Sequence, residues 1–285
     1  MLIALSPRSS RLRFAAISAL ATFGLIGPVS TIEAGKQSWP SHVAATYDIS
    51  FNGFGLGQLV FKANVGSGRY ELSGDAEISA LFGFVNWRGV TQTSGKLGGT
   101  RTNPSSYSFD FRSSEKAGSV RMGFGNGQIV SVSANPEPPR SPEFVPVERS
   151  HLKGVLDPLT AVMAMTRPES SAPCQQRLKI FDGIQRFDLV MAPAGTEQLK
   201  AKNGTINVLQ VCEMRYFPIS GYDRNGETPD LARNLRIRIS LRQVPEAGLF
   251  IPQEIKIPTA LGSVVLELEK AEIQAANRDQ VAFAD

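Results

Sequence analysis

Short runs of alternating apolar and polar residues fill most of the chain after residue 43. Residues 45–51 and 59–65 are two such runs, and Asn52-Gly53 between them is a strong hairpin signal. Similar runs follow at spacings of about 8 to 12 residues, with glycine or asparagine at the joins: they are 69–78, 87–94, 107–112, 120–123 and 128–132. The pattern predicts an antiparallel meander.

A proline-rich stretch, residues 135–149, ends this pattern. Its five prolines exclude a helix and a central strand, so we expect either a linker or an extended strap. A short helix is predicted at about residues 157–166, because Asp157 supplies an N-cap acceptor and Pro158 suits a first turn. One face of this helix consists of Leu159, Val162, Met163 and Thr166.

Strand patterns resume after Cys174. Residues 177–181 and 185–191 flank Asp182-Gly183, which we interpret as a two-residue hairpin turn. Later runs complete the series: 205–216, 233–244, 249–257 and 263–273. The predicted fold is all-β and mainly antiparallel, a curled or open β-barrel or spiral-like sheet with one short helix.

The first 34 residues have a different pattern. Three arginines precede an apolar run of about 14 residues, which Pro28 ends, and a polar stretch then leads to Ala34. This order predicts a signal peptide over residues 1–34, and the run is too short to span a membrane. An uncleaved N-terminal anchor is the alternative. We expect residues 35–285 to form a single β-rich periplasmic domain without a transmembrane span.

Charge changes this picture little. The net charge is +4, and it falls to +2 without the three arginines and one glutamate of the leader. The remaining basic residues alternate with apolar ones, as in residues 235–242, which is typical of a solvated sheet face. No basic run stands beside aromatic residues, so nucleic-acid binding is not expected.

The two cysteines, Cys174 and Cys212, both follow the leader. In an oxidising compartment an even pair predicts a structural disulfide. A redox pair would favour C-x-x-C spacing, and a zinc site needs more ligands than two cysteines and two distant histidines offer.

Catalytic motifs are missing from the sequence. No G-x-S-x-G elbow occurs, and the only histidines, His42 and His151, are expected to be surface or packing residues. The glycine clusters at 53–57 and 123–127 lie between predicted strands, so we interpret them as turns and bulges rather than phosphate-binding loops. We therefore assign no catalytic residue, no metal site and no cofactor.

Aromatic residues concentrate in the first half of the chain. The simplest interpretation is that they fill the core of the sheet. The alternative is that some line a cavity for an apolar ligand, as partly open barrels often provide. Residues 80–85 are apolar without alternation, which fits a loop folding into the mouth of such a cavity. Phe82, Phe84 and Trp87 are accordingly the candidate ligand-binding residues.

One set of residues is informative through its order and spacing. It comprises Tyr47, Gly53, Gly57, Pro104, Tyr107, Asp157-Pro158-Leu159, Cys174, Phe181-Asp182-Gly183 and Arg186-Phe187. Together these residues resemble a bacterial family of exported proteins known only as domain of unknown function 3108. The resemblance implies an exported, β-rich envelope protein, and it supplies no catalytic residues.

These observations favour a non-enzymatic cell-envelope protein that presents a curved β-surface or groove to a lipid-like molecule or an envelope protein. One alternative is a periplasmic hydrolase of envelope glycan or lipid, which a carboxylate pair in a cleft would favour. Another is a purely structural interaction module, which a completely filled core would favour. A continuous apolar cavity would favour the ligand carrier.

Overall fold

The first part of the sheet is an antiparallel meander. In the computed structural model, the described residues are 39–80, 85–98, 101–137, 141–167, 172–201, 204–275 and 280–284. The seven strands of the meander pair in chain order: β1 (His42–Phe51), β2 (Phe54–Gly66), β3 (Arg69–Ala80), β4 (Val85–Gly98), β5 (Arg101–Ser113), β6 (Ala117–Gly125) and β7 (Gln128–Asn135). Asn52-Gly53 and Asn126-Gly127 have positive φ at both positions, as expected of tight hairpin turns that match the strand twist.

The glycine cluster after the first turn forms the predicted bulge. The register of β1 and β2 shifts between Ile49 and Ser50, which lie opposite Gly57 and Gly55. A Cβ atom on Gly57 would overlap the backbone carbonyl of Glu77 on β3. Glycine at position 57 therefore allows β2 and β3 to approach closely at the bulge.

The C-terminal strands continue the same sheet from the other edge of β1. The order runs through β15 (Gly262–Gln274), β14 (Leu249–Thr259), β13 (Arg236–Val244), β11 (Ile206–Ser220), β10 (Arg186–Lys200) and β9 (Arg177–Phe181). β7 and β9 stand at the two ends of this order and do not pair with each other within the described chain. The predicted open, mainly antiparallel sheet is confirmed, and it is not closed into a barrel.

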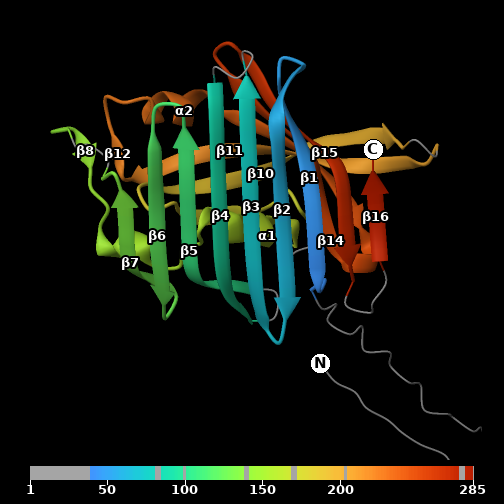
Figure 1. Ribbon diagram of the computed structural model, residues 1–285, viewed down its shortest axis with the longest axis horizontal. Helices are drawn as coiled ribbons and strands as arrows, with labels where there is room; N and C mark the ends of the chain where they lie inside the picture. Colours follow the sequence, from blue (N-terminus) through green and yellow to red (C-terminus); the bar gives the residue numbers. More distant parts are fainter. Residues whose placement is uncertain are drawn as a thin grey trace, which may run out of the picture. The chain divides into compact units, whose positions relative to one another are not determined.

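The sheet divides at β15. Residues 262–267 of β15 pair with β14, whereas residues 270–274 pair with β16 (Gln280–Ala284). The first half of β14 has left β15 and pairs with β13 alone. In Figure 1 the meander strands run vertically, and β10 and β11 cross behind them.

Helix α1 (Pro158–Thr166) lies between these two parts of the sheet (Figure 1). Leu159 and Met163 belong to a buried cluster with residues of β2, β3, β5, β6 and β7. Ala161 and Met165 belong to a second cluster with residues of β9, β10, β11 and β13. Because both sides of the helix are buried, this short segment is stabilised by packing rather than by its own propensity.

A buried polar network fixes the start of α1. Asp157 is the N-cap residue: its Oδ1 accepts a hydrogen bond from the backbone N–H of Thr160 at 2.8 Å, and the Thr93 hydroxyl donates to Oδ2 at 3.1 Å. The hydroxyls of Thr160 and Tyr70 are 3.1 Å apart. Burial raises the pKa of Asp157, and the hydrogen bonds to its carboxylate act in the opposite direction. The network ties the helix to β3 and β4.

The loop between β9 and β10 is longer than predicted. The sequence predicts a two-residue turn at Asp182-Gly183, but Phe181 pairs with Arg186, so four residues form the loop. The Asp182 carboxylate accepts hydrogen bonds from the backbone N–H groups of Ile184 and Gln185, at 2.8 and 2.6 Å. These two bonds stabilise the loop together with a backbone bond, which the Asp182 N–H donates to the Gln185 carbonyl at 3.2 Å.

Two smaller features complete the fold. The described part of the proline-rich stretch is a strap, in which β8 (Phe144–Val145) pairs with β12 (Tyr222–Asp223). A second helix, α2 (Thr228–Asn234), packs near β11 and was not predicted from the sequence. None of its residues is buried, so it has no apolar period for a sequence pattern to detect.

The predicted disulfide between Cys174 and Cys212 is confirmed. Cys212 is in β11 and is completely buried, while Cys174 lies between α1 and β9. The bond therefore ties the segment after the helix to the second part of the sheet.

We expect Asp157→Ala to lower the free energy of unfolding by about 1–3 kcal/mol, because it removes the cap and leaves the buried Thr160 N–H unpaired. Asp157→Asn should cost less, since the amide oxygen still accepts that bond. Urea denaturation followed by circular dichroism measures both effects. Asp230→Ala, in the exposed first turn of α2, is the control and should change stability by less than about 0.5 kcal/mol. Equal effects at positions 157 and 230 would contradict the network.

The double variant Cys174→Ala, Cys212→Ala should unfold at lower urea concentration than the oxidised protein. The chain-entropy model gives a closure spanning 38 residues roughly 4 kcal/mol. Wild-type protein kept reduced should match the double variant, which separates loss of the bond from loss of cysteine packing. Identical midpoints for oxidised protein and double variant would disprove a stabilising role.

Candidate functional site

An apolar pocket of about 150 Å³ lies between α1 and the strands around it. Its wall includes side chains of β1 (Val43, Ala45, Tyr47), β2 (Leu59, Phe61, Ala63, Val65), β14 (Leu249, Phe250, Ile251, Pro252, Ile255) and β15 (Leu266). The pocket therefore forms where the first half of β14 leaves β15. Nearly all of its side chains are hydrocarbon, which excludes a polar or charged molecule as its main occupant.

The predicted face of α1 is part of this wall. All four residues that the sequence places on one side of the helix, Leu159, Val162, Met163 and Thr166, line the pocket. Val162 is 38% exposed although its helix is packed between two parts of the sheet. An exposed apolar side chain in a pocket wall provides contact area for a ligand.

Trp39 and a nearby arginine form one side of the pocket. Trp39 precedes β1, is 9% exposed and lines the pocket. The guanidinium of Arg167 lies 5.0 Å from the centre of the Trp39 ring, within range of a cation–π interaction. Burial lowers the pKa of Arg167. Because Trp39 is in the wall, its fluorescence should respond to an occupant.

The buried carboxylate beside the pocket is structural. Asp157 is completely buried and its oxygens are hydrogen-bonded to Thr160 and Thr93. A general acid or base must reach the reacting atoms of a substrate, and this carboxylate has no exposed surface. It positions the helix that lines the pocket.

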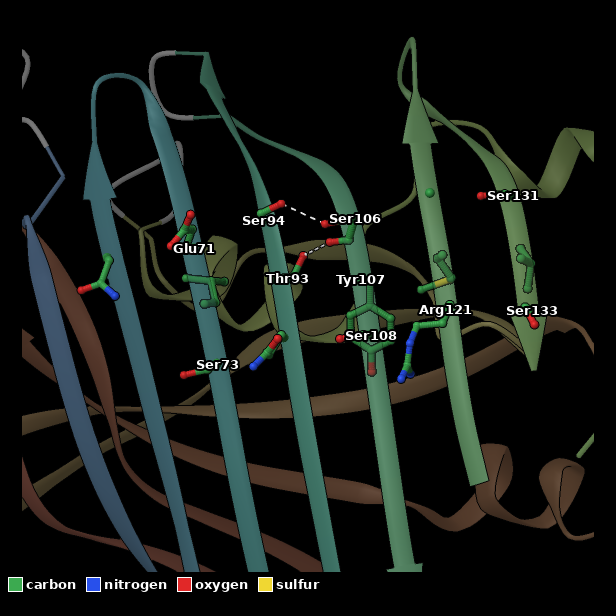
Figure 2. Close-up of a pocket in the computed structure, with 16 residues that line it drawn as sticks. Glu71, Ser73, Thr93, Ser94, Ser106, Tyr107, Ser108, Arg121, Ser131 and Ser133 are labelled. Atoms are coloured by element: carbon green, nitrogen blue, oxygen red, sulfur yellow. Dashed lines mark hydrogen bonds between the residues drawn. The ribbon is translucent and has the colours of Figure 1, made fainter. Parts of the chain in front are cut away.

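A second hollow, of about 670 Å³, lies over β3 to β7 and is polar (Figure 2). Hydroxyl side chains dominate its labelled lining: Ser73, Thr93, Ser94, Ser106, Ser108, Ser131 and Ser133. The Ser94 and Ser106 hydroxyls are 2.9 Å apart. Arg121 donates to both carboxylate oxygens of Asp110, at 2.7 and 2.9 Å, so its charge is offset.

Among its described lining residues, the polar hollow has no carboxylate or imidazole hydrogen-bonded to a serine. A serine nucleophile needs a general base within hydrogen-bond reach. Among the described residues that line the hollow, Glu71 is the one carboxylate, and it forms no hydrogen bond with a serine. The carboxylate of Asp75, on the same meander, forms an ion pair with Arg88 at 2.6 Å. The geometry gives no support to acyl transfer here.

The structure describes one of the three residues that were predicted to bind a ligand. Phe82 and Phe84 lie outside the described residues. Trp87 is on β4. A Cβ atom added at Gly89 would overlap the Trp87 ring and would lie in close contact with the Phe109 ring. Trp87 is not among the residues that line the apolar pocket. Their role in binding stays a prediction.

The two histidines make local hydrogen bonds. His42 Nδ1 is 2.8 Å from Asn64 Oδ1, and His151 Nδ1 accepts a hydrogen bond from the backbone N–H of Glu148. Within the described ranges, no three side chains of His, Cys, Asp or Glu gather as metal ligands. Neither described helix has the length and apolarity that a membrane span requires.

Comparison with known families places the chain beside one described family. Residues 46–269 match the model of a family described as "Protein of unknown function (DUF3108)". The chain belongs to this family. The DUF3108 match includes α1, the disulfide and most of the pocket wall, whereas Trp39 precedes it. No curated protein and no solved structure matches the chain.

Sequence reasoning missed the part of the pocket wall that β14 and β15 form. The strands of residues 249–257 and 263–273 were predicted, but not their position beside β1 and α1. The pairing of β15 with β1 joins residues more than 200 positions apart, which no local pattern signals. The one usable signal was the apolar face of α1, which gave four wall residues.

Proposed function

We propose that this DUF3108 protein is an exported cell-envelope protein that binds the apolar part of a lipid-like ligand in the pocket beside α1. The observation that carries the proposal is the pocket itself: its wall is apolar, and Val162 within it is exposed. Apolar surface that a fold leaves unfilled is the usual basis of small-molecule binding.

The size of the pocket limits what it accepts. A cavity of about 150 Å³ lined by aliphatic and aromatic side chains accepts a benzene-sized molecule. The pocket therefore suits one apolar group, such as a ring or a short segment of an acyl chain, rather than a whole lipid. The remainder of a larger ligand would lie outside, next to Val162 and the neighbouring strands.

The sequence supports export to the periplasm. Residues 1–34 have the charged, apolar and polar order of a signal peptide. The disulfide between Cys174 and Cys212 fits an oxidising compartment. In that compartment a carrier of lipid-like molecules would meet its ligands at either membrane.

Protein recovered from a bacterial envelope fraction should begin within a few residues of Gly35. N-terminal sequencing measures this directly. A start at Met1 would contradict cleavage and would favour the uncleaved anchor.

Val162→Phe should abolish binding of a small apolar probe, because the ring would occupy the space that the probe needs. We suggest α-methylstyrene as the probe and isothermal titration calorimetry as the measurement, with a loss of at least tenfold in affinity. Trp39 fluorescence in a Trp87→Phe background, which leaves Trp39 as the one tryptophan, gives an independent signal.

Val130→Phe is the matched control, since Val130 is 63% exposed on β7 and does not line the pocket. It should bind α-methylstyrene as the wild type does. Equal binding by both variants would place the ligand elsewhere. If the wild type binds no probe, and native mass spectrometry of periplasmic protein finds no lipid, a structural interaction module becomes the better hypothesis for the function.

A further inference from the structure

Tyr47 is a buried tyrosine in the wall of the apolar pocket. It lies in the middle of β1, opposite Leu59 of β2 and Leu268 of β15, and it is 6% exposed. A bulge in the pairing with β15 falls between Thr46 and Tyr47. Its neighbours in the core are apolar residues of β13 to β15, so the ring is fixed by packing.

The hydroxyl of Tyr47 has no hydrogen bond to any described residue, which sets it apart from the other tyrosines of the core. The Tyr70 hydroxyl is 3.1 Å from that of Thr160, Tyr107 has a hydrogen bond with Thr91, and Tyr216 donates to Gln185 Oε1 at 2.7 Å. Burial raises the pKa of Tyr47 well above its usual value, and no hydrogen bond contributes to the shift. A buried tyrosine hydroxyl usually has a partner.

The other hydroxyls of the pocket wall already donate hydrogen bonds within the protein. Thr91 donates to the backbone carbonyl of Ser108 at 3.1 Å, and Thr166 donates to that of Met163 at 2.7 Å. The hydroxyl of Ser220 also has no hydrogen-bond partner, but it is completely buried, and Ser220 does not line the pocket. Among the hydroxyls of the described wall, that of Tyr47 is therefore the one without a hydrogen-bond partner within the protein.

We propose that the ligand carries a hydrogen-bond acceptor, such as the carbonyl oxygen of an ester or ketone, that pairs with the Tyr47 hydroxyl inside the apolar pocket. This inference rests on the proposed function, that the pocket binds a lipid-like molecule. An acceptor on an otherwise apolar ligand would satisfy the buried hydroxyl, which a pure hydrocarbon would leave unpaired. The ligand class is thus an acyl ester or a similar carbonyl compound rather than a hydrocarbon.

Two probes of nearly the same shape test this. Acetophenone has a carbonyl oxygen where α-methylstyrene has a methylene group, so they differ in the acceptor. Tyr47→Phe should weaken acetophenone binding by about 2- to 12-fold, the range of one net hydrogen bond. It should leave the affinity for α-methylstyrene within about twofold, because a hydrocarbon makes no hydrogen bond. Calorimetric titration measures all four affinities.

The thermal midpoint of the free protein separates this role from a structural one. Tyr47→Phe should leave it unchanged, whereas the control Tyr216→Phe should lower it by removing the bond to Gln185. A midpoint lowered as much by Tyr47→Phe would show a partner within the protein and overturn the inference. Equal weakening of both probes would mean that Tyr47 acts by packing, and would also overturn it.

The same titrations distinguish failure of this inference from failure of the proposed function. If the wild type binds both probes and Tyr47→Phe changes neither affinity, the pocket is a ligand site but the hydroxyl does not donate a hydrogen bond to the carbonyl. If the wild type binds neither probe, the proposed function fails and the inference fails with it.

Discussion

The buried carboxylate of Asp157 is the constraint on which the arrangement of this protein depends. A buried carboxylate without partners is strongly destabilising, so its bonds to Thr160 and Thr93 must form in the folded state. Turning or sliding α1 by one residue would break them. With the start of the helix fixed, Leu159 and Met163 must face the meander while Ala161 and Met165 face the second part of the sheet.

The split at β15 follows from enclosing a helix within one continuous sheet. Strands β1 and β15 stay paired along their whole length, but β14 leaves β15 halfway to reach β13 on the far side of α1. A helix of nine residues is only about 14 Å long, so it cannot fill all the space that the separating strands open. The apolar pocket is the part that remains, and Leu249 and Ile251 of the departing strand form one of its walls.

The features that the sequence predicted are those with local chemical causes. Asn52-Gly53 specifies its own turn, and Asp157 with Pro158 specifies the start of α1. The four-residue loop was missed because the Asp182 side chain, not the turn dipeptide, determines its length. The position of the apolar pocket was missed for a different reason. Its wall combines β1 with β14 and β15, and the position of these strands follows from the whole sheet rather than from any segment.

An unfilled apolar pocket affects the stability of the folded state. Apolar side chains that line an open pocket stay in contact with water, which costs the folded state part of the stabilisation that their burial would give. One larger side chain at Val162 would remove most of this cost. An occupant that fills the pocket recovers the same free energy by binding the folded state alone, so ligand binding and stability are coupled. A completely packed interaction module would have no such term, and the pocket therefore favours the carrier.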